Sequence, residues 1–126
     1  GDDEVLSQQS DLYFEFPYAY STFWEEPKLY NNISNHLKEL ELTGFVGDIV
    51  ETAFLKHIMT NAGKMEKMVI QFDNNCSIDG ALSAMELLHF PKISIDLALE
   101  LKPSPSYLAM EGGNFNSWIE SLLVNI

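Results

Sequence analysis

Two short stretches with the same spacing of apolar residues decide the fold of this chain: Leu37-Lys-Glu-Leu-Glu-Leu42 and Met65-Glu-Lys-Met-Val-Ile70. Each stretch has apolar side chains at its first, fourth and sixth positions. The first begins at residue 37 and the second at residue 65, so the spacing recurs after 28 residues. A period of about 20–29 residues is typical of repeats that each contain one strand and one returning segment. The pattern therefore predicts strands over 37–42 and 65–70 in consecutive repeats.

The segment between these two strands carries the signals of a helix. Asp48 stands three residues before Glu51, which is the spacing of a capping box at the start of a helix. Gly63 stands where a left-handed residue ends a helix at little cost. We therefore expect one helix over about 48–62. Its apolar stripe is predicted to contain Val50, Phe54, Leu55, Ile58, Met59 and Ala62.

A strand, a helix and a second strand in this order form a βαβ unit, because parallel strands need such a crossover. The period matches that of leucine-rich repeats. The predicted fold class is α/β, with leucine-rich-repeat-like βαβ units, parallel strands and an irregular C-terminal cap. Six side chains of the unit are expected to be buried together: Leu40, Leu42, Phe54, Ile58, Met68 and Ile70.

The N-terminal flank follows the repeat less closely. Shifting back by 28 residues from Leu40 and Leu42 leads to Leu12 and Phe14. These two residues lie in an alternating stretch of apolar and polar side chains, which predicts a strand. We interpret this strand as part of a degenerate N-terminal repeat.

The C-terminal flank is predicted to contain two helices and a strand. Asp79 is expected to cap a helix that Pro91 ends. Apolar residues alternate with others over 93–101, which predicts a strand with one exposed face. Ser117 and Glu120 have the spacing of a second capping box, at the start of a terminal helix. The chain is therefore predicted to be one domain over 1–126, with an irregular N-terminal repeat (1–35), core repeats (36–91) and a cap (92–126).

Composition and charge exclude several classes of function. The chain has 7 basic and 19 acidic residues, and its net charge of −12 opposes binding to nucleic acids and to anionic membranes. Cys76 is the only cysteine, and the N-terminus lacks the basic and apolar regions of a signal peptide. These features predict a cytoplasmic or nuclear protein. A start at Gly1 without methionine predicts a piece of a longer chain.

No pattern in the sequence predicts catalysis, a cofactor or a bound metal. A nucleophilic Cys76 would need a histidine at a recognised spacing, and His36, His57 and His89 do not supply one. The ligand pairs of a zinc site are missing, and the segment from Asp73 lacks the glycine and the closing glutamate of a calcium loop. We therefore expect a protein that is not an enzyme and needs no cofactor.

A group of aromatic residues near the N-terminus is the candidate surface for binding a partner. Aromatic side chains are enriched at the energetic centres of protein interfaces, although clusters of them are more often buried in cores. Exposure of these side chains would favour a role in binding a partner, and burial would favour a role in the hydrophobic core. The candidate residues are Tyr13, Tyr18, Tyr20, Phe23 and Trp24.

The middle of the chain resembles a known family. Gly44-Phe-Val-Gly47, Asn61-Ala62 and Met65-Glu-Lys-Met68 occur in the order and at the spacing found in the C-terminal, FBD-like region of plant F-box proteins with leucine-rich repeats. The resemblance covers about residues 36–72. It implies that the intact protein is a substrate-recognition subunit of a cullin-based ubiquitin ligase, whose repeats contact an unknown target protein. The F-box, which would bind the ligase adaptor, has no counterpart in these 126 residues.

Two other functions are compatible with the sequence. The first is a leucine-rich-repeat scaffold or immune-receptor fragment with no link to ubiquitin. The upstream sequence decides between this hypothesis and the F-box hypothesis, because it would contain an F-box in one case and a domain such as a nucleotide-binding domain in the other. The second is a small acidic enzyme. An enzyme predicts a deep pocket with convergent polar groups and perturbed pKa values, whereas an open repeat surface does not.

Overall fold

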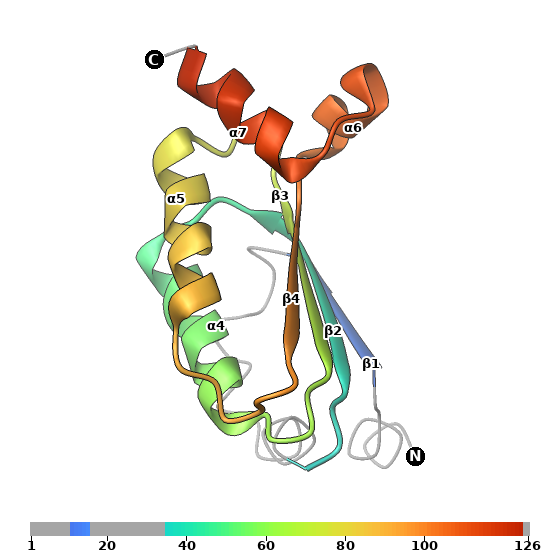
Figure 1. Cartoon of the computed structure of the whole chain (residues 1–126), viewed down its shortest axis with the longest axis vertical. Coiled ribbons are helices and arrows are strands. Elements are labelled where there is room, and N and C mark those ends of the chain that lie inside the picture. The colour runs from blue at the N-terminus through green and yellow to red at the C-terminus, as the bar shows by residue number, and fades with distance from the viewer. Residues whose placement is uncertain (1–10, 16–34, 125–126) are drawn as a thin grey trace.

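The computed structural model of the chain describes residues 11–15 and 35–124, without the side chains of Leu12, Phe14, Glu15 and Glu111. Within these residues, neighbouring strands pair in parallel in the order β1-β2-β3-β4. The strands are β1 (Asp11–Glu15), β2 (Glu39–Phe45), β3 (Lys67–Phe72) and β4 (Ala98–Lys102). Helices α4 (Ile49–Asn61) and α5 (Ile78–Glu86) both lie on one face of the sheet (Figure 1). The remaining helical segments are η1 (Leu87–His89), α6 (Pro105–Glu111) and α7 (Phe115–Val124).

The register of the sheet equals the period of the sequence. Leu40 lies opposite Met68 in the β2–β3 pair, and Leu12 lies opposite Leu40 in the β1–β2 pair. Both steps are 28 residues long, so the spacing of apolar residues is the spacing of the strands. The predicted parallel strands, the helix between them and the N-terminal strand are therefore confirmed. The step from Met68 to its β4 partner Leu99 is longer, because the third crossover contains extra residues.

The two central strands begin and end later than predicted. The sequence predicts 37–42 and 65–70, whereas β2 and β3 begin at Glu39 and Lys67. Leu37 and Met65 are nevertheless buried, and both belong to the same apolar core as the side chains of the strands. The backbone N–H groups of Glu66 and Lys67 both donate to the carbonyl of Lys38, which joins the segments that lead into the two strands. The apolar spacing therefore marks the buried positions correctly but includes residues ahead of the strands.

The core lies between the sheet and the two helices. All six side chains that were predicted to be buried together, from Leu40 to Ile70, are at most 1% exposed. The predicted apolar stripe of α4 is wrong at its first residue, because Val50 is 45% exposed. In the first turn of the helix, the inward position belongs to Glu51, which is buried. The apolar stripe therefore begins at Phe54.

The start of α4 is as predicted, and its end is different. Asp48 is the N-cap, and a complete capping box joins it to Glu51. At the other end, the N–H of Ala62 donates to the carbonyl of Ile58. Gly63 does not have a positive φ, so the prediction of a left-handed residue there is wrong. Ala62 itself leaves the helical conformation, with φ −88° and ψ 80°, and no left-handed residue is needed.

The beginnings of the later helices also differ from the predictions. Ser77, and not Asp79, caps α5, because its hydroxyl accepts the N–H of Gly80. The terminal helix α7 begins at Phe115, three residues ahead of its predicted start. The side-chain oxygen of Asn114 accepts the N–H of Ser117, so that serine lies inside the first turn and does not cap the helix.

The predicted strand over 93–101 is reduced to its last part. Its first residues belong to the crossover loop, where Ile93 donates its N–H to Met59 and the hydroxyl of Ser94 donates to Met65. Ile95 is consequently 93% exposed. Pairing with β3 begins only at Ala98, which explains where β4 starts.

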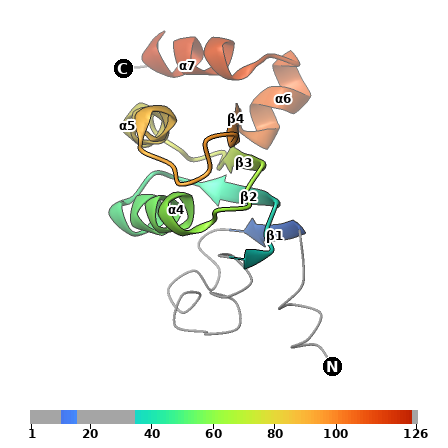
Figure 2. The same cartoon turned by 60° about the horizontal axis from the view of Figure 1, so that its bottom comes forward.

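The C-terminal helices lie at one end of the stack of strands (Figure 2). Helix α6 had no predicted counterpart, and it begins with Pro105 at its first position. The ring of Phe72, at the end of β3, lies 5.5 Å from that of Phe115 and 4.8 Å from that of Trp118. Trp118 is only 3% exposed. This aromatic contact joins α7 to the core of the repeats.

Candidate functional site: the open face of the sheet

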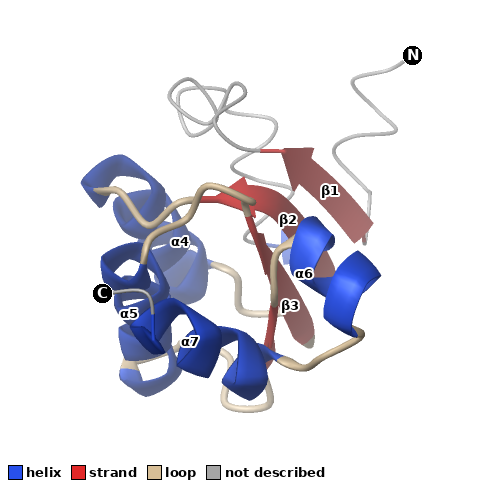
Figure 3. Cartoon of the chain, turned by 90° about the horizontal axis from the view of Figure 1, so that it is seen from above, coloured by secondary structure: helices blue, strands red, loops and turns tan. Residues whose placement is uncertain are grey.

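The sheet has one face without helices α4 and α5, and this open face is the candidate site (Figure 1). Because successive side chains of a strand point to opposite faces, the residues between the buried leucines lie on it. Helix α6 lies at the carboxyl ends of the strands, on the side away from α4 and α5 (Figure 3). The N–H of Ser106, in the first turn of α6, donates to the side chain of Asn74 after β3. The described residues on the open face are Asp11, Tyr13, Glu39, Glu41, Thr43, Lys67, Val69, Gln71, Ala98, Glu100 and Lys102.

The register arranges these side chains in rows across the strands. The first row runs from Asp11 through Glu39 and Lys67 to Ala98. The second runs through Tyr13, Glu41, Val69 and Glu100. A row therefore collects one residue from each repeat, and a binding surface forms from residues that are far apart in the sequence.

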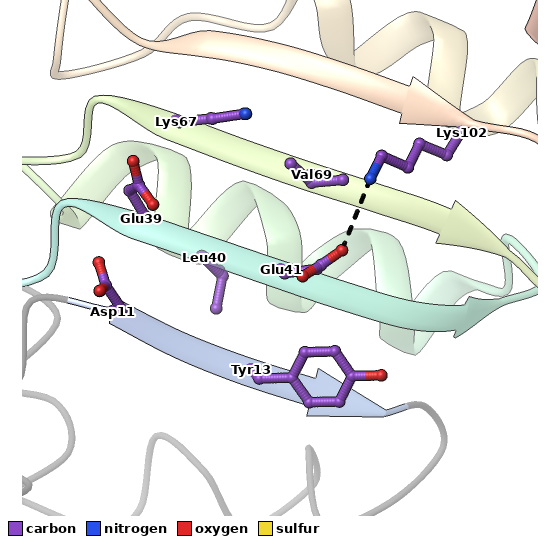
Figure 4. A pocket seen from close by; sticks show the side chains of 8 residues that line it. All are labelled: Asp11, Tyr13, Glu39, Leu40, Glu41, Lys67, Val69 and Lys102. Atoms are coloured by element: carbon purple, nitrogen blue, oxygen red, sulfur yellow. Dashed lines mark ion pairs between the residues drawn. The ribbon is translucent and has the colours of Figure 1, made fainter.

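Both lysines of the open face are engaged in ion pairs with glutamates. Lys67 Nζ lies 3.7 Å from Glu100 Oε2, and Lys102 Nζ lies 3.8 Å from Glu41 Oε1. The second pair spans from β4 to β2 and crosses β3 beside Val69 (Figure 4). Val69 is only 7% exposed, although it is on the open face.

A hollow of about 340 Å³ lies on this face (Figure 4). Acidic side chains line it at the start of β1 and β2, and the ring of Tyr13 lines it from the middle of β1. A second hollow of about 250 Å³ adjoins it toward α6, and Tyr13 lines both. The residues around the first hollow are Asp11, Tyr13, Glu39, Leu40, Glu41, Lys67, Val69 and Lys102.

Tyr13 is the one predicted partner-binding residue whose position the structure describes. It is 62% exposed, and its hydroxyl lies 3.4 Å from Thr43 Oγ1 on β2. The other four candidates, Tyr18, Tyr20, Phe23 and Trp24, lie outside the described residues. Apart from Leu40, which was predicted to be buried, the remaining side chains around the hollow were not singled out by sequence reasoning. Glu39, Glu41 and Lys67 occupy polar positions of the repeated strand pattern, and that alternation is the signal that could have found them.

The turn after β2 is built around a buried carboxylate. Glu51 is 1% exposed, and its Oε1 accepts the backbone N–H groups of Val46, Gly47 and Asp48 at 3.1, 2.8 and 3.1 Å. Burial raises the pKa of Glu51, repulsion from Asp48 adds to this, and the backbone hydrogen bonds oppose it. The Gly-Phe-Val-Gly segment therefore has a structural role: it wraps the carboxylate that begins α4.

Cys76 belongs to the contact between successive repeats. It is buried, and its Sγ lies 3.7 Å from the carbonyl oxygen of Val46. Burial raises the pKa of Cys76 to about 12, and the negative charges of Glu51 and Asp73 contribute. The thiol is therefore protonated at neutral pH, and a nucleophilic role has no support.

Two further classes of site have no candidate among residues 11–15 and 35–124. No three His, Cys, Asp or Glu side chains in these ranges are grouped so that they could hold a metal ion. None of the helices in these ranges has the length and apolar content required to span a bilayer.

The comparisons with known proteins bear on the central repeat. Residues 32–70 match the FBD family model. The matched segment is less than a third of the chain, and its described part consists of β2, α4 and most of β3. The FBD-like region thus contains one strand–helix–strand unit up to the last two residues of β3, and it contributes the central strands of the open face. No curated protein and no solved structure matches this chain.

Proposed function

We propose that this chain is the target-recognition region of an F-box protein in a cullin-based ubiquitin ligase, as the resemblance of residues 36–72 to such proteins implies. The observation that carries the proposal is the FBD match over residues 32–70. In this role the chain performs no catalysis and needs no cofactor. It holds a target protein in the cytoplasm or nucleus, while an F-box elsewhere in the intact protein binds the ligase adaptor.

The architecture supports binding of a protein through the open face. A parallel ladder of repeats presents one continuous row of side chains from each strand position, which suits an extended partner surface. The hollow of about 340 Å³ and the exposed ring of Tyr13 lie on this face. Exposed aromatic side chains are enriched at the energetic centres of protein interfaces.

A pull-down with the purified ligase adaptor tests the proposed division of roles. This chain is compared with a longer version that includes its native upstream sequence. We expect the longer protein to retain the adaptor and the 126-residue chain not to retain it. Equal capture by both would contradict the division of roles. Capture by neither would exclude the F-box assignment and leave only a repeat-built binding domain.

A further inference from the structure

Two carboxylates of the open face lie opposite each other on neighbouring strands. Asp11 on β1 and Glu39 on β2 are direct partners in the sheet register. Neither forms an ion pair among the described residues, since Lys67 is engaged with Glu100. Like charges directly opposite each other destabilise a sheet, so these two carboxylates repel each other. A cation supplied by a partner would remove the repulsion.

The space beside these carboxylates admits the side chains of a partner. The hollow has a volume of about 340 Å³ and is open to solvent. The carboxylates of Asp11 and Glu39 lie at the amino ends of their strands, and the Tyr13 ring lies farther along β1 (Figure 4). Val69, beside the ion pair that joins β4 to β2, gives the middle of the face an apolar component.

The combination of an aromatic ring and two carboxylates matches the chemistry of one side chain, arginine. A guanidinium group is planar, donates hydrogen bonds in a fixed fork to carboxylates and stacks on aromatic faces. A tyrosine ring attracts a cation placed over its face. The Tyr13 ring is exposed and lies on the same strand as Asp11, two residues away, so both point to the open face.

We infer that the open face binds a basic, extended segment of a protein partner, with one arginine of that segment between Asp11 and Glu39 and the next arginine on the same side of the segment beside the ring of Tyr13. The inference rests on the proposed function for the statement that the partner is a protein. The net charge of −12 favours the approach of such a segment.

A fluorescently labelled eight-residue peptide of alternating arginine and serine is the probe, because an extended chain places its arginines on one side. Binding to the 126-residue chain is measured by fluorescence anisotropy at low ionic strength. The same peptide with citrulline in place of arginine keeps the shape and removes the charge. We expect the arginine peptide to bind and the citrulline peptide to bind at least tenfold more weakly.

Two double variants with the same net charge separate a local site from general attraction. Asp11→Asn with Glu39→Gln should weaken binding about tenfold, because two contacts with the cation are lost. Asp96→Asn with Glu120→Gln removes two exposed carboxylates away from the open face and should leave the affinity unchanged. Tyr13→Ala should weaken binding roughly threefold.

Equal weakening by the two double variants would overturn the inference, since it would reduce the binding to net charge. Equal affinity for the citrulline peptide, or no binding of the arginine peptide, would overturn it as well. The Asp11→Asn, Glu39→Gln protein should be at least as stable as the wild type, because a repulsion is removed. If this variant binds the peptide more weakly but keeps its stability, the weaker binding is due to lost contacts with the peptide and not to unfolding.

The outcome is independent of the adaptor pull-down. If the longer protein retains the adaptor and the peptide result is negative, the inference fails and the proposed function stands. If the adaptor is not retained and the peptide binds at the open face, the proposed function fails and the basic ligand stands.

Discussion

At the scale of single residues, Glu51 is the clearest case of a side chain whose surroundings define its role. A buried carboxylate is unfavourable unless hydrogen bonds compensate for the loss of water. Here one oxygen, Oε1, accepts three backbone N–H groups from the turn that precedes α4. The carboxylate therefore organises the turn and the first turn of the helix together.

Removal of this acceptor should destabilise the protein. Glu51→Ala leaves three N–H groups of the turn without their partner and should lower the free energy of unfolding by about 2–4 kcal/mol. Glu51→Gln keeps an oxygen that can occupy the position of Oε1 and should cost at most about 1.5 kcal/mol. Urea denaturation followed by circular dichroism measures both. Equal losses in the two variants would show that the negative charge, and not the acceptor geometry, holds the turn.

The pH dependence of stability should report the burial of Glu51. Burial raises its pKa in the folded protein above the ordinary value of 4.5. A raised pKa stabilises the fold fully below pH 4.5, and this contribution is lost as the pH rises through the folded-state pKa. The free energy of unfolding of the wild type, relative to Glu51→Gln, should therefore fall as the pH increases from 4.5 toward 7. A difference that stays constant or grows over this range would contradict the prediction.

At the scale of elements, the close approach of successive repeats limits what the turns tolerate. Gly47 has φ +85°, and a Cβ there would overlap the backbone of Gly80 at the start of α5. A Cβ at Gly80 would in turn overlap the carbonyl of Val46. The two glycines therefore allow the turn after β2 to touch the next helix.

A pair of glycine substitutions tests this contact. Gly47→Ala should lower the free energy of unfolding by at least about 2 kcal/mol, since the backbone would be strained and the two segments would have to separate. Gly63→Ala is the matched control, because its Cβ would meet nothing within 4 Å and its φ is not positive. It should be neutral or stabilise by about 0.4–1 kcal/mol. Chemical denaturation of the two variants gives the comparison, and a tolerated Gly47→Ala would contradict the proposed contact.

The inward face of α4 should carry most of that helix's contribution to stability. Phe54 is fully buried, and Phe54→Ala should cost about 3–5 kcal/mol if the site does not collapse. Val50 lies one turn earlier and is 45% exposed, so Val50→Ala should stay within about 0.5 kcal/mol of the wild type. The midpoints of urea unfolding provide both values. A loss below about 1 kcal/mol for Phe54→Ala would mean that the packing of the helix is different.

At the scale of the whole molecule, the aromatic cluster around Phe72 determines how the ladder of repeats ends. Phe45 and Phe72 follow each other at the ends of β2 and β3, with ring centroids 5.5 Å apart. Phe115 and Trp118 of α7 continue this row beyond the last repeat. The side chains of α7 therefore cover a part of the core that another repeat would otherwise cover.

Loss of this cover should be costly. Trp118→Ala removes a 3%-exposed side chain and should lower the free energy of unfolding by about 3–5 kcal/mol. Leu123→Ala, on the same helix but 50% exposed, should cost less than about 1 kcal/mol. Guanidinium denaturation of the two variants measures the difference. Similar small losses in both would show that α7 does not contribute to the stability of the repeats.

Local spacing determined the parts of this fold that depend on neighbours in the sequence. The apolar positions of 37–42 and 65–70 predicted the sheet register, because equivalent residues of successive repeats lie opposite each other in neighbouring strands. Asp48 and Glu51 predicted the start of α4, since a capping box involves only residues within one turn. Leu12 and Phe14 located the first strand by the same 28-residue step.

Only the tertiary structure decided the features that depend on distant contacts. The alternation over 93–101 is uniform, and the contacts of Ile93 and Ser94 with the preceding crossover determine that β4 starts at Ala98. Asn114 and Ser117 are both good helix caps, and the packing of Phe115 on Phe72 agrees with the earlier start. The open-face site also depends on distant contacts. Its rows join residues from four strands, and these residues are brought together by the sheet register and are not adjacent in the sequence.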